Sequence, residues 1–518
     1  MSNAVVRAPL LVGLDIGSTN VKAVIYEPDG RAVALASVPT ITHYPRPTWA
    51  HYDANELWAS AVTVLREATA QLDDPRRIAG IAVASMGEAG VPLDADDKPT
   101  FDTIAWFDRR TIEQADRLRD VIGDDALFAV TGVSLQAIFS LCKIMWIQQH
   151  QPEAFARTVR WLHVAEYVAY RLSGVGATDW SLASRSLAFD IKKRDWDDGI
   201  LRAAGVSRDL LAPAVASGTK IGEVIAAAAT VTGLPAGASV AAGGHDHVCG
   251  ALAAGVIRKG QLLDSMGTAE GLLVAFEEPN FDPDLGRQGY AQGAHVVPGV
   301  NYCFGGIYTS GASVDWARRA VGGDADLGQL LAEADAASTG SLGVGFIPHL
   351  RLADPPHSDS RARAAFVGLT TDVERGTLFR AVLEGLAYEA RLSVEPLIDF
   401  YALDGMPEIS VTGGGSKNDL FLRIKASVYN QPLRVVDLQE ATALGAAMLA
   451  GIGAGVYCDA ADALRHVQAH PTTVEPNAED VAFYDRYYAR VYRHMYEALR
   501  PLNHGIHALV SDQPGSGG

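Results

Sequence analysis

"PLLVGLDIGSTNVKAVIYEPDGRAVALASV" (residues 9–38) contains three apolar runs separated by two short polar segments. The first polar segment is DIGSTN at residues 15–20, and the second is a PDG turn at residues 28–30. This pattern predicts three consecutive strands with a tight, exposed turn between the first two. Backbone amides and hydroxyl groups in such a turn can face a bound anion.

The same pattern returns near the middle of the chain. GQLLDSMGTAEGLLVAF (residues 260–276) again predicts a strand, a short turn and a strand, and its DSMGT (residues 264–268) echoes the earlier DIGST. A chain of 518 residues exceeds what one hydrophobic core usually supports. We therefore expect two domains, residues 1–254 and 255–505, and a flexible tail at 506–518.

Strands and helices alternate through the second half. A strand at 408–414 is followed by a helix at 418–430, a strand at 432–437 and a helix at 441–455. Closer to the N-terminus, NELWASAVTVLREATAQL predicts an amphipathic helix that begins with Asn55 as its cap. Alternating strands and helices are typical of an α/β protein.

Composition excludes several classes of protein. The chain has 43 Lys and Arg against 61 Asp and Glu, a net charge of -18, which argues against nucleic-acid binding. Its four cysteines are far apart and form no CxxC pair, so we expect a reducing cytoplasm rather than a disulfide framework. The N-terminus has no secretory signal pattern. The longest stretch without a charged residue or a histidine, residues 224–244, lacks the bulky apolar content of a membrane span.

The two turns of the echo are candidate anion-binding sites. The first turn and its flanks supply the carboxylate of Asp15, which suits Mg²⁺, the hydroxyls of Ser18 and Thr19, and the cation of Lys22. A plain polar hairpin is the alternative. The absence of any Gly-Lys dipeptide excludes a Walker A loop. In the second turn Gly267 permits close backbone approach and Thr268 adds a hydroxyl, although a plain turn is the better interpretation of that segment by itself.

Two further segments have a composition that suits ligands. Gly413 to Gly415 leave a predicted strand, and Asn418 caps the helix that follows, so a flat nucleotide could lie against this backbone. Glu88 follows another predicted strand, and Trp106 lies near Asp108 and Arg110 in the sequence. A carboxylate with an aromatic face can grip a polyhydroxy compound. A surface acid and a core tryptophan remain the alternative there.

GGHDHVCG (residues 243–250) places an acid between two histidines directly after a glycine pair. The histidines could be a zinc pair, but H-x-H alone lacks the third and fourth ligands of a zinc site. We expect His245 to be structural and Cys249 to be a buried helix residue. The role of Asp246 stays open on this segment alone, between a helix cap and a catalytic acid.

Together these blocks resemble the FGGY carbohydrate kinase family over nearly the whole chain. GLDIGSTNVKAVIYEPDG looks like its first phosphate loop, GTAEG its second, and GGHDHVCGALAAG its catalytic-acid segment. YTSGASVDWARR is similar to its nucleotide-side helix, and VTGGGSKNDLFLRIKASVYNQPLRV with EATALGAAMLAG to its C-terminal signature. The resemblance implies an α/β fold of two RNase H-like domains, as in actin-like ATPases, with sugar and ATP in a central cleft.

The resemblance also implies roles for single residues. Asp246 is the expected general base, and Asp15 and Asp246 are the expected Mg²⁺ ligands. The expected contacts of the acceptor are Glu88, Trp106, Asp246 and His247. The expected phosphate-binding residues are Ser18, Thr19, Lys22, Gly267 and Thr268. The nucleotide side is expected to include Gly311, Asp315, Gly414 and Asn418.

The resemblance predicts an ATP-dependent kinase that phosphorylates a small sugar, a xylulose-like ketose or a polyol. Relatives acting on glycerol carry an arginine-glutamate pair where this chain has Gly87-Glu88, so that arginine is missing here. Ketopentose kinases usually carry a glutamine-methionine-histidine run at this point, which this chain also lacks. One alternative is a non-catalytic actin-like ATP-binding sensor or scaffold, and another is a metal-dependent hydrolase built on the HDH segment. Nucleic-acid and membrane partners are not expected, whereas a homodimer would be consistent with the family.

Overall fold

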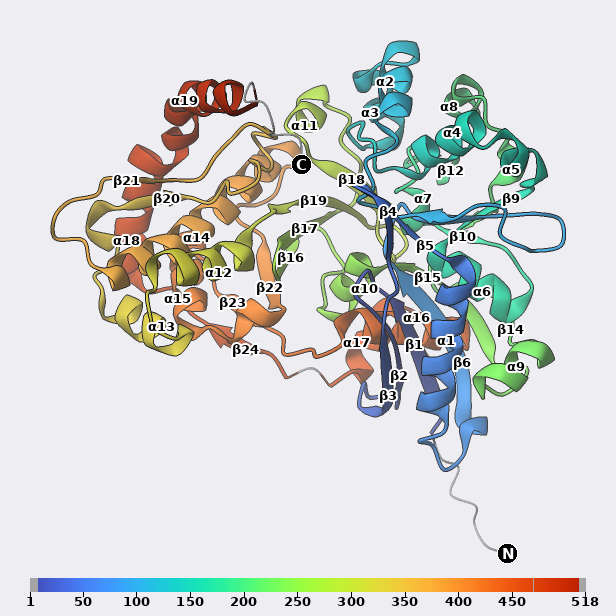
Figure 1. The fold of residues 1–518 in the computed structure, drawn as a ribbon. Coiled ribbons are helices and arrows are strands. Elements are labelled where there is room, and N and C mark those ends of the chain that lie inside the picture. Colours follow the sequence, from blue (N-terminus) through green and yellow to red (C-terminus); the bar gives the residue numbers. More distant parts are fainter. Residues whose placement is uncertain (1–7, 469, 512–518) are drawn as a thin grey trace, which may run out of the picture.

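Two twisted sheets organise the computed structural model, which describes residues 8–468 and 470–511 (Figure 1). The first sheet has the strand order β14-β15-β6-β1-β2-β3. Its strands are β1 Leu10–Ile16, β2 Asn20–Tyr26, β3 Ala32–Pro39, β6 Ile78–Ser85, β14 Lys220–Glu223 and β15 Ser239–His245. β1, β2 and β3 are antiparallel, as residues 9–38 predict, whereas β1, β6 and β15 run parallel.

The second sheet repeats this plan with the order β18-β19-β17-β16-β22-β23-β24. Its strands are β16 Gln261–Met266, β17 Glu270–Phe276, β18 Ala291–Ala294, β19 Asn301–Ile307, β22 Glu408–Thr412, β23 Leu433–Val435 and β24 Thr472–Val474. Again three antiparallel strands (β16, β17, β19) adjoin two parallel ones (β22, β23). The two similar sequence segments are therefore the β1–β2 and β16–β17 hairpins of two equivalent sheets, and the fold is the predicted α/β pair.

Helix α16 (Ala441–Gly453) connects the two halves. In the chain it lies between β23 and β24 of the second sheet, but it packs on β1, β6 and β15 of the first sheet and beside α10 (Asp246–Ala253) (Figure 1). A β-carbon built on Gly445 would lie 1.9 Å from the Cys249 carbonyl oxygen, and one on Gly13 would lie 1.8 Å from that of Ala443. The alanines and glycines of α16 therefore allow contact between backbones. The predicted division after residue 254 falls between the strands of the two sheets, yet α16 shares the core of the first.

Several local predictions meet the structure directly. The helices predicted at 418–430 and 441–455 are α15 (Asp419–Tyr429) and α16, and Asn418 caps α15 through a 3.1 Å bond from the Phe421 amide. The helix predicted from Asn55 is α1 (Ala54–Thr69), but its cap is Asp53, which accepts the Asn55 and Glu56 amides. Asp53 is the cap because its carboxylate stands one position before the first helical residue, where a cap must lie.

The C-terminal helix extends into the segment that we predicted to be a flexible tail. Helix α19 (Arg493–Ser511) includes residues 506–511, which we expected to be flexible, and residues 512–518 lie outside the described residues. The helix continues because Ile506, Leu509 and Val510 keep a helical spacing and the next helix-breaking residue is Pro514. All four cysteines are free, and Cys249 is buried in α10 as predicted. Among the described residues, no helix has both the length and the apolar character that crossing a bilayer requires.

Substitution of a single helical glycine tests the backbone contact of α16. Alanine is the better helix former, so Gly505→Ala, in open space on α19, should raise the free energy of unfolding by up to about 1 kcal/mol. Gly445→Ala should instead lower it by about 3 kcal/mol, because the methyl group overlaps the Cys249 carbonyl. Urea denaturation of both variants provides the measurement. Equal effects of the two substitutions would show that α16 does not pack this tightly.

Candidate functional site

Two carboxylates lie near each other at the ends of β1 and β15, the two parallel strands on either side of β6 in the first sheet. Asp15 stands one residue before the end of β1, and Asp246 directly follows β15 as the first residue of α10. The Oδ1 atom of Asp15 is buried and has no hydrogen-bond partner. Burial first, and then the nearby negative charge of Asp246, raise the pKa of Asp15 to about 8. A buried, unpartnered carboxylate oxygen next to a second carboxylate fits a hard divalent cation such as Mg²⁺.

The histidines on either side of Asp246 do not complete a zinc site. Within the described residues no group of three or more His, Cys, Asp or Glu side chains could hold a metal. Mg²⁺ needs no such group, because one or two carboxylates usually hold it together with waters and substrate phosphates. His245 is buried, and burial lowers its pKa to about 3, so it stays neutral. His247 is exposed, and its ring centroid lies 5.6 Å from that of Phe304 on β19 of the other sheet.

The first hairpin contacts both halves of the molecule. Lys22 on β2 forms bonds of 3.0 and 2.8 Å to the carboxylate of Glu440, which precedes α16. In the turn, the Ser18 hydroxyl accepts a 2.9 Å bond from the Trp106 indole. The structure thus joins a predicted acceptor residue, Trp106, to a predicted phosphate-binding residue. Thr19 beside them is exposed at the tip of the turn.

Glu88 is buried beside an arginine that the sequence does not place near it. Its backbone has a φ of 59°, a left-handed conformation that is unusual for a residue other than glycine. Arg185, which follows α7 (Trp180–Ala183), contacts Glu88 Oε1 through Nε at 2.6 Å and through Nη2. The guanidinium also lies over the Phe139 ring, 5.1 Å from its centroid. The arginine missing at position 87 therefore has a counterpart, supplied about a hundred residues later in the chain.

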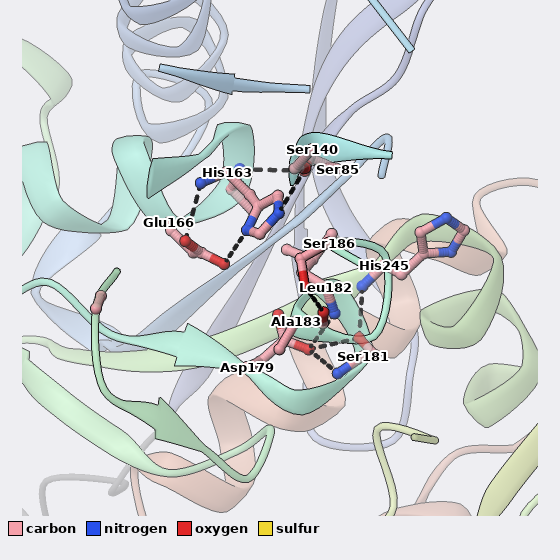
Figure 2. Close-up of polar contacts among 12 residues, drawn as sticks. Ser85, Ser140, His163, Glu166, Asp179, Ser181, Leu182, Ala183, Ser186 and His245 are labelled. Carbon is pink, nitrogen blue, oxygen red and sulfur yellow. Dashed lines mark hydrogen bonds and ion pairs between the residues drawn. The ribbon is translucent and has the colours of Figure 1, made fainter. Parts of the chain in front are cut away.

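Buried polar groups bind the backbone carbonyl of Glu88. Its carbonyl oxygen accepts bonds from Lys143 Nζ at 2.8 Å and from Ser140 Oγ at 2.9 Å, both on α4 (Ser140–His150). Burial lowers the pKa of Lys143 to about 7. Figure 2 shows Ser140 beside His163, which in turn contacts Glu166 at 2.7 Å. These contacts fix the loop that carries Glu88 in its strained conformation.

A second network of hydrogen bonds in Figure 2 ends at His245, the residue before Asp246. Asp179 accepts a 2.5 Å bond from Ser181 Oγ, and the same oxygen of Ser181 accepts the His245 amide at 2.9 Å. Burial raises the pKa of Asp179 to about 6. A β-carbon on Gly87 would lie 2.7 Å from the His245 ring, so only glycine fits beneath it. The His245 backbone is thereby fixed at the start of α10, and the structural role of its side chain stays a prediction.

The second hairpin, α12 (Ser310–Val321) and the glycine loop lie together. The Gly311 and Ala312 amides donate to the carbonyls of Gly267 and Thr268, both at 3.1 Å. A β-carbon on Gly311 would lie 2.6 Å from the Gly267 carbonyl oxygen, which explains the glycine. Gly413, with φ 90°, lies against the backbone of Met266, whereas Gly414 borders open space. Asp315 is exposed on α12, one turn after its start.

Three charged residues in these surroundings were not anticipated. Arg185 and Lys143 surround Glu88, and Lys425 of α15 lies buried between Asp264 and Glu270 of the second hairpin. The sequence pattern predicts no role for Asp264 beyond its place in the repeated DSMGT segment. The signal that could have identified Lys425 is a lysine on the apolar face of a predicted helix.

Known proteins resemble the chain in both sequence and structure. The N-terminal domain of the FGGY family of carbohydrate kinases matches residues 10–253, and its C-terminal domain matches residues 262–454. The xylulose kinase of Bacillus subtilis is 28% identical over 95% of this chain and 98% of its own length. The glycerol kinase of Citrifermentans bemidjiense is 31% identical over 86% and 90%. The crystal structure of the Rhodospirillum rubrum xylulose kinase has a TM-score of 0.87 and 28% identity, covering 96% of this chain and all of that one.

A double-mutant cycle tests the pairing of Glu88 with Arg185. Arg185→Met or Glu88→Gln alone leaves one partner buried without the other and should lower the free energy of unfolding by about 3–5 kcal/mol. The double variant should recover at least about 1 kcal/mol of the summed loss. The exposed Lys220–Glu223 pair is the control, where we expect no measurable coupling in urea denaturation. Additive losses at Glu88 and Arg185 would contradict the pairing.

Proposed function

The chain belongs to the FGGY family of carbohydrate kinases, and we propose which of its residues carry out the reaction of that family. The protein is an ATP-dependent sugar or polyol kinase, a phosphotransferase whose acceptor is an alcohol. Its fold is that of the actin-like ATPases. The matching relatives are kinases, which disfavours the alternative of a non-catalytic ATP-binding sensor or scaffold.

We propose that Asp246 is the general base. The observation that carries this assignment is the proximity of Asp246 to Asp15 at the ends of the parallel strands β15 and β1, which flank β6, beside the first hairpin. The Asp246 carboxylate takes the proton of the acceptor hydroxyl as its oxygen bonds to the γ-phosphorus and the bond from phosphorus to the leaving ADP oxygen breaks. A carboxylate suffices, because phosphoryl transfer depends mainly on positioning and neutralisation of charge.

The same two carboxylates are the proposed Mg²⁺ ligands. When bound there, Mg²⁺ would neutralise charge on the phosphates of ATP. Hydroxyl and backbone groups of the two hairpins would bind these phosphates, from Ser18, Thr19, Lys22, Gly267 and Thr268. Gly311, Asp315, Gly414 and Asn418 are the proposed nucleotide-side residues. On this proposal residues 1–254 supply the acceptor site and the first hairpin, and residues 255–505 supply the nucleotide site.

The acceptor proposal is a small neutral ketose or polyol with adjacent hydroxyl groups. Arg185 binds Oε1 of Glu88 and holds the carboxylate in place, so that Oε2 can accept a bond from one hydroxyl. His247 would bind a neighbouring hydroxyl, and Trp106, held by Ser18, would form a wall. A xylulose-like ketopentose fits best with the similarity to xylulose kinases. The cytoplasmic location and the homodimer stay predictions.

Asp246→Asn tests the general base. The variant should lose about 10³-fold in kcat, because an amide cannot accept the proton, while the affinity for ADP without metal in calorimetry changes by less than about threefold. Asp15→Asn should instead raise the Mg²⁺ concentration that gives half the maximal rate. Near-normal turnover of Asp246→Asn would defeat the assignment, and an unchanged Mg²⁺ requirement of Asp15→Asn would remove Asp15 from the metal site.

A coupled ADP-release screen over ketoses, aldoses, tetritols and pentitols tests the acceptor proposal. Ketopentoses should give the highest kcat/KM of the set. With the best acceptor, Glu88→Gln should raise the acceptor KM by about tenfold, because the amide donates where the hydroxyl also donates, and should leave the ATP KM within about twofold. A rise in the ATP KM alone would place Glu88 outside the acceptor site.

A further inference from the structure

A buried cluster of charges lies behind the second hairpin. Asp264 on β16, Glu270 at the start of β17 and Lys425 on α15 all have side chains without solvent exposure. Lys425 Nζ contacts Asp264 Oδ2 and lies 2.5 Å from Glu270 Oε1. Burial and the neighbouring Glu270 raise the pKa of Asp264, whereas the two carboxylates raise the pKa of Lys425. The ammonium is therefore the positive charge that keeps two buried acids together.

The cluster reaches all three segments of the nucleotide side. Glu270 Oε2 accepts a 2.7 Å bond from Ser310 Oγ, at the first residue of α12. One residue on, the Gly311 amide donates to the Gly267 carbonyl in the hairpin tip. Lys425 lies on α15, the helix that directly follows the glycine loop at 413–415. In Figure 1, α12, α15 and β16 converge in the same part of the second half.

The two hairpins meet the same electrostatic problem in different ways. The register of the two hairpins differs by one position, because Asp15 pairs with Lys22 as the second pair from its turn and Asp264 pairs with Leu272 as the third. The Oδ1 atom of Asp15 has no partner and lies beside a second carboxylate, so its position suits a cation from solution. At Asp264 the cation is part of the protein. No second metal is needed to hold this hairpin.

We propose that Lys425 is a positioning residue of the nucleotide site: its buried ammonium, held by Asp264 and Glu270, fixes the second hairpin, the start of α12 and the glycine loop in register. The inference rests on the proposed nucleotide site. Removing the ammonium leaves two uncompensated acids, which separate or take up a proton, and Ser310 then loses its fixed acceptor. The acceptor site lies on the other sheet and contacts none of these three residues.

Steady-state kinetics and nucleotide binding of Lys425→Met test the proposal. We expect the ATP KM and the MgADP Kd to rise at least tenfold, with the acceptor KM within about twofold. Ser310→Ala cuts only the link to α12 and should raise the ATP KM about threefold to fivefold, so it serves if Lys425→Met does not fold. Glu384→Gln is the matched control, because it breaks the buried Arg380–Glu384 pair of α14 (Arg375–Phe400) in the same half. It should lower the thermal midpoint without changing the ATP KM.

Two results would overturn the inference. The first is a lower thermal midpoint of Lys425→Met with unchanged ATP KM and MgADP Kd, since the cluster would then serve stability alone. The second is an unchanged ATP KM in Ser310→Ala. Gly311→Ala pushes a methyl group against the Gly267 carbonyl. This variant distinguishes failure of the Lys425 inference from failure of the proposed nucleotide site. If Gly311→Ala also leaves nucleotide binding intact, the nucleotide site itself is wrongly assigned.

Discussion

Direct backbone contact of α16 with β1 and α10 is the constraint on which the site depends. Glycines at positions 13 and 445 remove the side chains that would keep these backbones apart. The contact brings Glu440, just before α16, within reach of Lys22 on the first hairpin. It also supports α10, whose first residue is Asp246. Residues about 200 and 430 positions apart in the chain thereby become neighbours. Because the interior is closely packed, a small change in volume at one of them shifts the others.

The acids in and beside the two hairpins differ in how their negative charge is compensated. Lys425 neutralises Asp264 and Glu270 from inside the protein, and Lys22 pairs with Glu440 at a half-buried position. Burial and the charge of Asp246 outweigh the influence of Lys22 on Asp15, so the pKa of Asp15 stays raised. A carboxylate left in this state favours a cation, because burial penalises its charged form until an opposite charge arrives. This contrast supports the proposed Mg²⁺ site at the first hairpin.

The acceptor side follows the same logic. Glu88 stands in a left-handed conformation, which is costly for a residue with a β-carbon. Lys143 and Ser140 hold its carbonyl, and Arg185 holds its carboxylate. With both ends fixed, the Glu88 side chain has little freedom to lose when a hydroxyl compound binds. Preorganisation of this kind lowers the entropy cost of recognition.

Local pattern determined much of this protein. The apolar runs and turn residues of 9–38 and 260–276 specify both hairpins, and the glycine run with Asn418 specifies the loop and cap before α15, because these features depend on neighbours in sequence. Asp15 and Glu88 could be proposed from their positions after predicted strands, whereas the role of Asp246 was implied by the resemblance to the family. Tertiary structure alone decided that Arg185 pairs with Glu88, that Lys425 pairs with Asp264, and that α16 packs on the first sheet. Those partners are separated by about 100 to 430 residues, and no periodicity or turn signal encodes a contact made only when distant elements pack together.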